Sequence, residues 1–543
     1  MPSRDEPIDE AAVQREAAHR AADESVARAR AGREALEETL NDCLYHADRR
    51  ARAHPPDDAE ARVLAGAREA IQLRDPARLE AATHALCAHY ATEIGGYFDP
   101  RMFALASWLA PGFLSLLLSA TSLPRLLLQG LKREDLDRRL VIDGEVGPLS
   151  RLVQVGTLVC TPTHTSHMDS LVMGYVLQRV GLPRFIYGAG KNLFASPLLG
   201  FFLQHLGTYK VDRLKDEGLY KRTLKNYCVT TLTRRLGNLF FPGGTRSRSG
   251  ALEQELKLGL LGCGLEAYVL NLQAGRPSPR IFIVPATVSY HVVLEAETLI
   301  DDYLRDEGQS RYIIDDDEVS RPARVAQFVS ALLAMDGQIH VRFGPALDPF
   351  GNAVDAEGRS CDPHGRVVDE RRYVFDAEGR PALDPARDRQ YTRELGAAIV
   401  ERLHRSNTVL PTHITCFAVM QALVERSGEQ DLYRVLRSPH LAQGLDAAAL
   451  AERVGRLLGA LRQRAQAGEL HLPADLGTDA RHIVAAAERA LGLYHAPPPL
   501  ERRGDLIHVG QPALVYYYRN RLAGYGLDDY PFLEPRARKG NRR

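Results

Sequence analysis

The sequence LVCTPTHTSHMDSL at residues 158–171 joins a short apolar run to a polar loop and then to a helix-like segment. The apolar run ends at Cys160, His164 lies in the loop, and Asp169 follows five positions later. Residues five apart on one helix point roughly 140° away from each other, so the two side chains can meet only if His164 lies in the loop and Asp169 in the first helical turn. Ser166 is the expected N-cap of that helix. In this arrangement the histidine can take a proton from a hydroxyl while the carboxylate orients its other ring nitrogen and stabilises the imidazolium.

A purely structural alternative stays open for Asp169. Ser166-x-x-Asp169 also fits a capping box, in which the acid would only stabilise the start of the helix, and the residues alone favour neither alternative. A metal site built from His164, His167 and Asp169 would need further clustered ligands, which the neighbouring sequence lacks. We therefore predict no metal and expect His167 to have a structural role.

Short β-branched and aromatic runs alternate with helix-like stretches after Leu152. This alternation predicts an α/β domain whose sheet is at least partly parallel, with the site in loops where strands end. The predicted strands are Val153–Thr161, Arg184–Tyr187, Asn238–Phe241, Arg280–Tyr290 and Gln338–Phe343.

The regions on either side of this domain differ from it in composition. A chain of 543 residues exceeds one ordinary core, so two or three structural units are expected. Residues from 8 to about 90 and those after Tyr391 have helix-like spacing of apolar positions. The predicted regions are a helical region at 1–135, the α/β domain at 136–348, a turn-rich β insertion at 349–390 and a helical domain at 391–543.

An uncharged stretch at 102–124 is nominally long enough to span a bilayer, but Pro111-Gly112 interrupts it. Each half is about ten residues, which is too short to cross roughly 30 Å of hydrocarbon as a straight helix. We expect a re-entrant or surface-lying helical hairpin in contact with a membrane, and a buried helix pair is the alternative.

The insertion contains three copies of an Asp-x-x-Gly-Arg pattern. They lie at Asp355–Arg359, Asp362–Arg366 and Asp376–Arg380. Asp and Gly at these offsets predict tandem β-turns, whereas a calcium site would need a denser set of acidic ligands.

Overall charge and cysteine usage narrow the class of protein. Lys plus Arg equals Asp plus Glu at 69 each, which argues against a nucleic-acid partner and requires any anion site to be local. The 7 cysteines are odd in number and show no CxxC spacing, so reduced thiols in a cytoplasmic compartment are expected. The acidic, polar start MPSRDEPIDE is unlike a signal peptide, so export is not expected.

Three further segments combine glycines with basic residues at the ends of expected strands. They are GAGKNL at 188–193, GTYKVDR at 207–213 and FFPGGTRSRSG at 240–250. The first is not a P-loop, because Phe185 stands at the leading glycine position and Asn192 at the Ser or Thr position. Glycines allow close approach of the backbone and arginines offer forked donors, so the three segments together favour a phosphate-binding site.

These segments, in this order, resemble the motifs of the glycerol-3-phosphate acyltransferase family, in its bacterial and mitochondrial branch that includes the dihydroxyacetone-phosphate acyltransferases. His164 to Asp169 is similar to the first motif, 207–213 to the second, and 241–250 to the third. Ile283-Val284-Pro285 with Ser289-Tyr290-His291 is similar to the fourth, and the resemblance covers about residues 140 to 527. It implies a glycerolipid acyltransferase-type mixed sheet flanked by helices.

The resemblance also implies a role for each residue that matches a motif. His164 would be the catalytic base and Asp169 its partner. The acceptor phosphate would be bound by Arg213 and Arg246, with Lys191 and Arg248 as helpers. An acceptor and oxyanion loop would comprise Gly243, Gly244 and Thr245, and the acyl path would be lined by Val284 and Pro285. One departure is Gly243, because the third motif usually carries a glutamate at that position, and this leaves the acceptor's identity open.

The expected activity is transfer of a fatty acyl group from acyl-CoA or acyl carrier protein to glycerol 3-phosphate, in phospholipid biosynthesis. No cofactor or metal is implied beyond the acyl thioester co-substrate. Alternatives are the same chemistry on lysophosphatidate or dihydroxyacetone phosphate, and a catalytically inactive membrane-associated scaffold. The expected location is peripheral or monotopic on the cytoplasmic face of the inner membrane, in contact with its lipid surface.

Overall fold

The computed structural model of the protein describes residues 9–32, 35–96, 140–191, 207–306, 339–429 and 431–527. The apolar segment at 102–124 lies outside these residues. Within the described ranges, no helix combines the length and the apolar character needed to cross a membrane.

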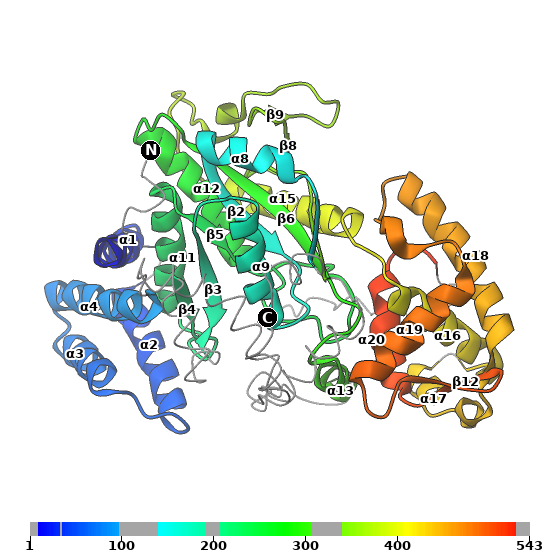
Figure 1. Cartoon of the computed structure of the whole chain (residues 1–543). Coiled ribbons are helices and arrows are strands. Elements are labelled where there is room, and N and C mark those ends of the chain that lie inside the picture. Colours follow the sequence, from blue (N-terminus) through cyan, green and yellow to red (C-terminus); the bar gives the residue numbers. More distant parts are fainter. Residues whose placement is uncertain are drawn as a thin grey trace, which may run out of the picture.

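A seven-stranded sheet forms the centre of the molecule, in the order β1-β7-β6-β2-β5-β3-β4 (Figure 1). Neighbouring strands are parallel except β6 and β7, which are antiparallel. The strands are β1 (Leu140–Gly144), β2 (Gly156–Pro162), β3 (Phe185–Gly190), β4 (Thr208–Val211), β5 (Gly237–Leu239), β6 (Arg280–Ser289) and β7 (Ile339–Phe343). The predicted mixed α/β fold is confirmed.

Helices cover both faces of this sheet, and β2 shows why. Every residue of β2 is buried. Leu158 packs in the core cluster that includes side chains of α9, whereas Val159 packs in the cluster formed with α11 and α12. The run LVC is therefore apolar without alternation, as a strand covered on both faces requires. Among the described residues, the helices of this region are α8 (Val146–Val155), α9 (Met168–Arg179), α11 (Gly218–Thr233), α12 (Leu258–Gln273) and α13 (Ala296–Asp306).

Two details of the strand prediction were wrong. Val153 to Val155 form the end of α8, because Leu149 and Leu152 of that helix are buried and their packing outweighs the β preference of valine. Strands β1 and β4, with the sequences LVIDG and TYKV, were not predicted.

The described residues between 9 and 96 form a bundle of four helices, as the spacing of their apolar residues indicates. They are α1 (Glu10–Arg30), α2 (Leu36–Ala51), α3 (Asp58–Leu73) and α4 (Pro76–Ile94). Aspartate side chains at positions 9, 57 and 75 accept backbone N–H groups at the starts of α1, α3 and α4. Helices α1 and α4 pack against α11, so the bundle lies beside the sheet at its β4 side (Figure 1).

The C-terminal region lies at the opposite end of the molecule (Figure 1). Helix α15 (Pro385–Arg405) packs on α12 and β6 of the central domain and leads to this region. The described helices of the C-terminal region are α16 (Pro411–Ser427), α17 (Leu432–Leu436), α18 (Ala447–Gln466), α19 (Ala480–Tyr494) and α20 (Pro512–Arg519). A small sheet, not predicted from the sequence, joins β10 (Leu445–Asp446), β12 (Leu506–Val509) and β11 (Leu500–Arg503). Helix α16 is the centre of this region, because it packs on α18, α19 and α20.

The segment at 349–384 consists of turns around the short strands β8 (Ala353–Val354) and β9 (Ser360–Cys361) and a short 3-10 helix (Glu370–Val374), and α15 begins at Pro385. In each Asp-x-x-Gly-Arg copy the aspartate accepts the backbone N–H and the side chain of the arginine four residues later. The three glycines have φ of 75 to 79°, in the left-handed region that this turn requires. These carboxylates therefore stabilise their own turns.

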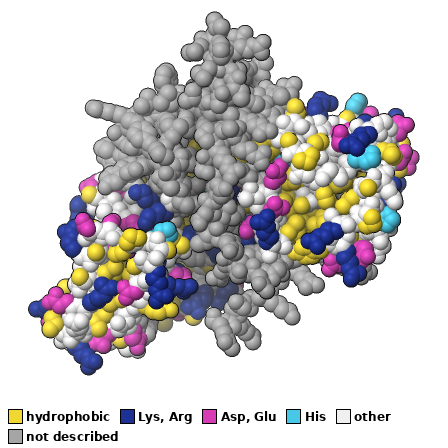
Figure 2. Space-filling model, turned by 90° about the horizontal axis from the view of Figure 1, so that it is seen from below, with side chains coloured by type: hydrophobic (Ala, Val, Ile, Leu, Met, Phe, Trp, Pro, Cys, Tyr) yellow, Lys and Arg dark blue, Asp and Glu magenta, His cyan; other side chains and the backbone are white. Residues whose placement is uncertain are grey.

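Seen from below, the described parts of the N-terminal bundle and of the C-terminal region carry interspersed acidic, basic and apolar side chains (Figure 2). Neither part of this face is dominated by one sign of charge, in agreement with the balanced composition.

Candidate active site

His164 and Asp169 meet at the end of β2. His164 lies in the loop after Pro162, and Asp169 lies in the first turn of α9. The Nδ1 atom of His164 is 3.1 Å from Oδ2 of Asp169, and the two residues are only 7% and 0% exposed. Because the carboxylate engages Nδ1, the other ring nitrogen, Nε2, is the one that can accept a proton from a substrate.

Both oxygens of the Asp169 carboxylate are held by further donors. Oδ2 also accepts the backbone N–H groups of Thr165 at 2.6 Å and Ser166 at 2.8 Å. Oδ1 accepts the hydroxyl of Tyr290 at 2.7 Å. The bond from the Ser166 N–H spans the three residues of the predicted capping box, but α9 begins one residue later than that box requires, so Asp169 braces the loop before the helix as well as His164. The N-cap residue of α9 is His167 rather than Ser166, although the Ser166 hydroxyl accepts the N–H of Met168 at 3.1 Å.

The surroundings of His164 favour its neutral form. Burial lowers the pKa of His164 below its usual value, the hydrogen bond and charge of Asp169 oppose this, and the charges of Arg246 and Arg213 lower it further. The ring also stacks on Phe241, with centroids 4.0 Å apart and planes inclined by 18°. A neutral imidazole fixed in this way is suited to act as a base near neutral pH.

Arg246 is tied to the histidine loop through Glu295. Its Nη1 atom lies 3.4 Å from Oε1 of Glu295, whose side chain is 0% exposed. Glu295 also accepts the hydroxyl of Ser166 at 2.8 Å and the backbone N–H of His167 at 3.1 Å. This single carboxylate therefore fixes Arg246 relative to the start of α9.

Arg213, at the end of β4, reaches the same loop. Its Nη2 atom donates to the carbonyl of Gly244 at 2.7 Å. Burial lowers the pKa of Arg213, and the charge of Arg246 lowers it further, so the two cations lie close enough to repel each other. Two guanidinium groups near His164, of which that of Arg246 is paired with Glu295, offer forked donors suited to a phosphate.

The other two cations predicted to bind the phosphate, Lys191 and Arg248, form ion pairs with residues outside the His164 loop. Lys191 bonds to Glu93 at 2.8 Å and to Asp212 at 3.0 Å, and Arg248 pairs with Asp302 at 2.9 Å, so both cations already have carboxylate partners. Their phosphate-binding roles stay predictions.

In the predicted oxyanion loop, Gly244 has a φ of 79° and its N–H donates to the carbonyl of Phe241 at 3.0 Å within the turn. The prediction of oxyanion donors therefore rests on the N–H groups of Gly243 and Thr245. Val284 and Pro285 lie on β6 beside β2, buried in the sheet, and their place in an acyl path stays a prediction.

Comparison with known proteins supports the resemblance of the motifs. Residues 145–289 match the family model described as Acyltransferase. The chain contains an acyltransferase domain. Proteins named glycerol-3-phosphate acyltransferase are similar to this chain in Pseudomonas fluorescens strain Pf0-1 (28% identical over 320 residues, 56% of this chain and 35% of that protein) and in Pseudomonas aeruginosa strain LESB58 (25% over 407 residues, 70% and 43%). The chain spans less than half of the length of these relatives. The predicted resemblance to the glycerol-3-phosphate acyltransferase family is confirmed by the domain match and by the names of these relatives.

The acyltransferase domain carries all four of the residues around which the site is built. His164, Asp169, Arg213 and Arg246 lie within the matched range. Two supporting residues lie just beyond it. Tyr290 was quoted in the fourth motif without a role, and Glu295 was missed because nothing in its local sequence links it to a loop 129 residues earlier.

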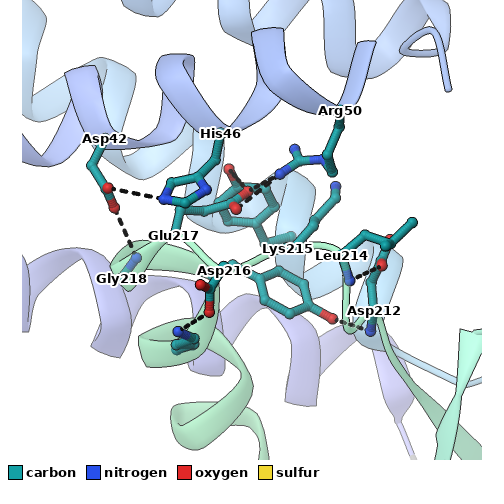
Figure 3. A network of polar contacts seen from close by, with 12 residues as sticks. Asp42, His46, Arg50, Asp212, Leu214, Lys215, Asp216, Glu217 and Gly218 are labelled. Atoms are coloured by element: carbon teal, nitrogen blue, oxygen red, sulfur yellow. Dashed lines mark hydrogen bonds and ion pairs between the residues drawn. The ribbon is translucent and has the colours of Figure 1, made fainter. Parts of the chain in front are cut away.

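The N-terminal bundle holds the segment of the acyltransferase domain that follows Arg213 (Figure 3). Arg50 of α2 faces Glu217, with Nη1 and Oε2 2.9 Å apart, and the Glu217 side chain is 0% exposed. Tyr90 donates its hydroxyl to the same carboxylate at 3.2 Å. Lys215 is 3% exposed and pairs with Glu60 at 3.0 Å and with Glu93.

A second contact of this network fixes the start of α11. Asp42 accepts the backbone N–H of Gly218 at 3.0 Å and lies 3.4 Å from His46 (Figure 3). Because residues 212–217 connect β4 to α11, the contacts of this network hold the backbone next to Arg213.

Proposed function

We propose that this protein is a glycerol-3-phosphate 1-O-acyltransferase, which transfers a fatty acyl group from acyl-CoA or acyl carrier protein to glycerol 3-phosphate. The observation that carries the proposal is the His164–Asp169 pair, 3.1 Å apart, with Arg213 and Arg246 close enough to alter the pKa of the histidine. The relatives named glycerol-3-phosphate acyltransferase support the choice of acceptor.

In the proposed reaction, Nε2 of His164 removes the proton from the acceptor's 1-hydroxyl as the oxygen attacks the thioester carbonyl. The C–S bond of the resulting tetrahedral intermediate then breaks, and the leaving thiolate takes the proton from the imidazolium to give the free thiol. Asp169 stabilises the imidazolium through Nδ1, and Tyr290 holds Asp169 from the other side. No covalent acyl-enzyme is required.

The two arginines supply position rather than proton transfer. A phosphate held by Arg213 and Arg246 would place the far hydroxyl of glycerol 3-phosphate beside His164, and such fixed geometry lowers the barrier of a bimolecular reaction. The N–H groups of Gly243 and Thr245 are the proposed donors to the developing oxyanion. We further propose that the segment at 102–124 attaches the protein to the cytoplasmic face of the inner membrane, which fractionation of cells with and without that segment would test.

The acceptor is tested by comparing three candidates side by side. Detergent-solubilised protein is given a long-chain acyl-CoA, or the same chain on acyl carrier protein, with glycerol 3-phosphate, dihydroxyacetone phosphate or lysophosphatidate. We expect the highest kcat/KM with glycerol 3-phosphate and a 1-acyl product. A higher value with another acceptor would reassign the substrate, and no thioester cleavage with any of the three would favour an inactive scaffold.

A further inference from the structure

Glu253 lies against the backbone of His164, although 89 residues separate the two in sequence. The segment after Arg248 folds back on itself, and the N–H of Lys257 donates to the carbonyl of Pro242 at 2.7 Å. Oε1 of Glu253 thereby reaches the backbone N–H of His164 at 2.9 Å. This carboxylate has no part in the mechanism described above.

The glycine at position 243 makes room for this side chain. A Cβ atom on Gly243 would lie 3.0 Å from Cγ and 3.3 Å from Oε1 of Glu253, which is closer than ordinary packing allows. Gly243 is not among the glycines with positive φ, so its backbone conformation does not itself require glycine. A methyl group at position 243 would therefore press on the Glu253 side chain and require it to move by a few tenths of an ångström.

The main chain of His164 is held on both sides by this one segment. Glu253 accepts its N–H at 2.9 Å, and the N–H of Ser247 donates to its carbonyl at 2.8 Å. The imidazole is held separately by Asp169 and Phe241. Since both the backbone and the ring of His164 are constrained, the loss of either set of contacts should change the direction of Nε2.

Desolvation makes the placement of this carboxyl costly. Burial raises the pKa of Glu253, whereas the bond from the His164 N–H and the charge of Arg521 lower it. Arg521 is itself buried and is fixed by Asn407 at 2.7 Å and by the carbonyl of Val288 at 3.0 Å. The chain thus keeps a partly buried acid beside the predicted base, where an apolar residue would avoid the desolvation cost.

We propose that Glu253 is a positioning residue for His164. Its carboxylate occupies the space left by Gly243, accepts the main-chain N–H of His164, and so directs the imidazole toward the acceptor hydroxyl. The acid that the third motif lacks at position 243 enters the site from position 253 instead. This inference rests on the proposed acyltransfer, and it assigns a role to a residue outside the motifs.

The kinetic test separates a hydrogen-bond acceptor from a charge. Glu253→Ala removes the acceptor and should lower kcat about tenfold or more, with the KM for glycerol 3-phosphate changed less than about twofold. Glu253→Gln keeps a carbonyl acceptor and should retain kcat within about threefold. Glu255→Ala, at an exposed position two residues away, is the matched control and should behave as wild type. Wild-type kcat in Glu253→Ala, a change in KM alone, or equal losses in the Ala and Gln variants would overturn the proposal.

Gly243→Ala tests the same contact from the other side. The added methyl group should displace Glu253, so this variant should lower kcat as Glu253→Ala does. The double variant Gly243→Ala/Glu253→Ala should be no worse than the poorer single variant, because both changes remove one contact. Additive losses would contradict the shared contact.

A structural readout keeps this test independent of the activity. In full-length protein labelled at histidine, the His164 resonance is assigned by its loss in His164→Gln and is followed by NMR over a pH series. Glu253→Ala should move the chemical shift and the titration midpoint of His164, and Glu253→Gln should leave both near the wild-type values. An unchanged His164 in Glu253→Ala overturns the positioning role, whereas a moved resonance in a protein without acyltransfer would support that role and refute the proposed function.

Discussion

Oδ2 of Asp169 lies 3.1 Å from Nδ1 of His164 and 2.8 Å from the backbone N–H of Ser166, so one oxygen both pairs with the predicted base and closes the start of helix α9. The His-x4-Asp spacing therefore couples the orientation of the imidazole to the first turn of the helix. A change that moves the start of α9 is expected to move the imidazole as well.

Tyr290→Phe tests whether the far side of Asp169 matters for turnover. The variant loses the hydroxyl that donates to Oδ1 at 2.7 Å and leaves a buried carboxylate with one donor fewer. We expect kcat to fall about three- to tenfold, with little change in the acceptor KM, measured as the initial rate of CoA release. Tyr433→Phe, which loses a hydroxyl bond to the carbonyl of Leu304, is the control and should keep the wild-type rate. A wild-type kcat in Tyr290→Phe would show that the Tyr290 hydroxyl has no role in turnover.

The pH dependence of kcat/KM should report His164. Burial and the charges of Arg246 and Arg213 lower the pKa of His164, so the acid limb should lie below 6.5, with activity present above the pKa and lost as the pH falls through it. Arg213→Gln removes one positive charge, which should raise this pKa and move the limb to higher pH. Arg213→Lys keeps the charge and should leave the limb in place. A limb that stays fixed or moves to lower pH in Arg213→Gln would be inconsistent with this electrostatic coupling.

Arg246→Ala should mainly weaken binding of the acceptor. A hydrogen bond to a charged group contributes roughly 1.5–3 kcal/mol, so the KM for glycerol 3-phosphate should rise about ten- to a hundredfold. Arg405→Ala, which removes an exposed arginine of α15 paired with Glu401, is the matched control. Steady-state kinetics over a wide acceptor range provide the measurement, and an unchanged KM in Arg246→Ala would disprove a phosphate contact.

The N-terminal bundle should stabilise the site through Glu217. Breaking a buried ion pair from one side costs roughly 3–5 kcal/mol, and Glu217→Ala leaves Arg50 without its fully buried partner. Glu80→Ala, which breaks the exposed pair with Arg30, should cost less than about 1 kcal/mol. Denaturant unfolding followed by circular dichroism compares the two. Equal losses of stability would mean that the buried network contributes no more than a surface pair.

The sequence predicted the features that depend on short spacings and on motif order. His164 and Asp169 were paired because a strand, a loop and a helix follow one another within a few residues. The segments at 207–213 and 240–250 were noticed from their glycines and basic residues, and Arg213 and Arg246 were singled out within them by the resemblance to the acyltransferase motifs. The structure brings these residues together, as the motif order indicated.

The residues that sequence reasoning missed act over long separations. Glu253 and Glu295 bond to the histidine loop from 89 and 129 residues away, and an isolated glutamate carries no signal for such a contact. Strand β1 pairs with β7 across a gap of nearly the whole domain, with Leu140 opposite Ile339, and this pairing follows from the tertiary fold rather than from local pattern. The wrong strand at Val153 to Val155 has the same origin, since packing of α8 outweighed local preference.

The most direct test of the central claim is release of free CoA from a long-chain acyl-CoA by detergent-solubilised protein, with and without glycerol 3-phosphate, beside His164→Ala. A positioned base contributes about 10²- to 10⁴-fold, so the acceptor-dependent release should fall by that factor in the variant while its circular dichroism spectrum stays that of wild type. His482→Ala, at an exposed position of α19, should retain the full rate. A folded His164→Ala protein that still releases CoA at the wild-type, acceptor-dependent rate would contradict the assignment of His164 as the base.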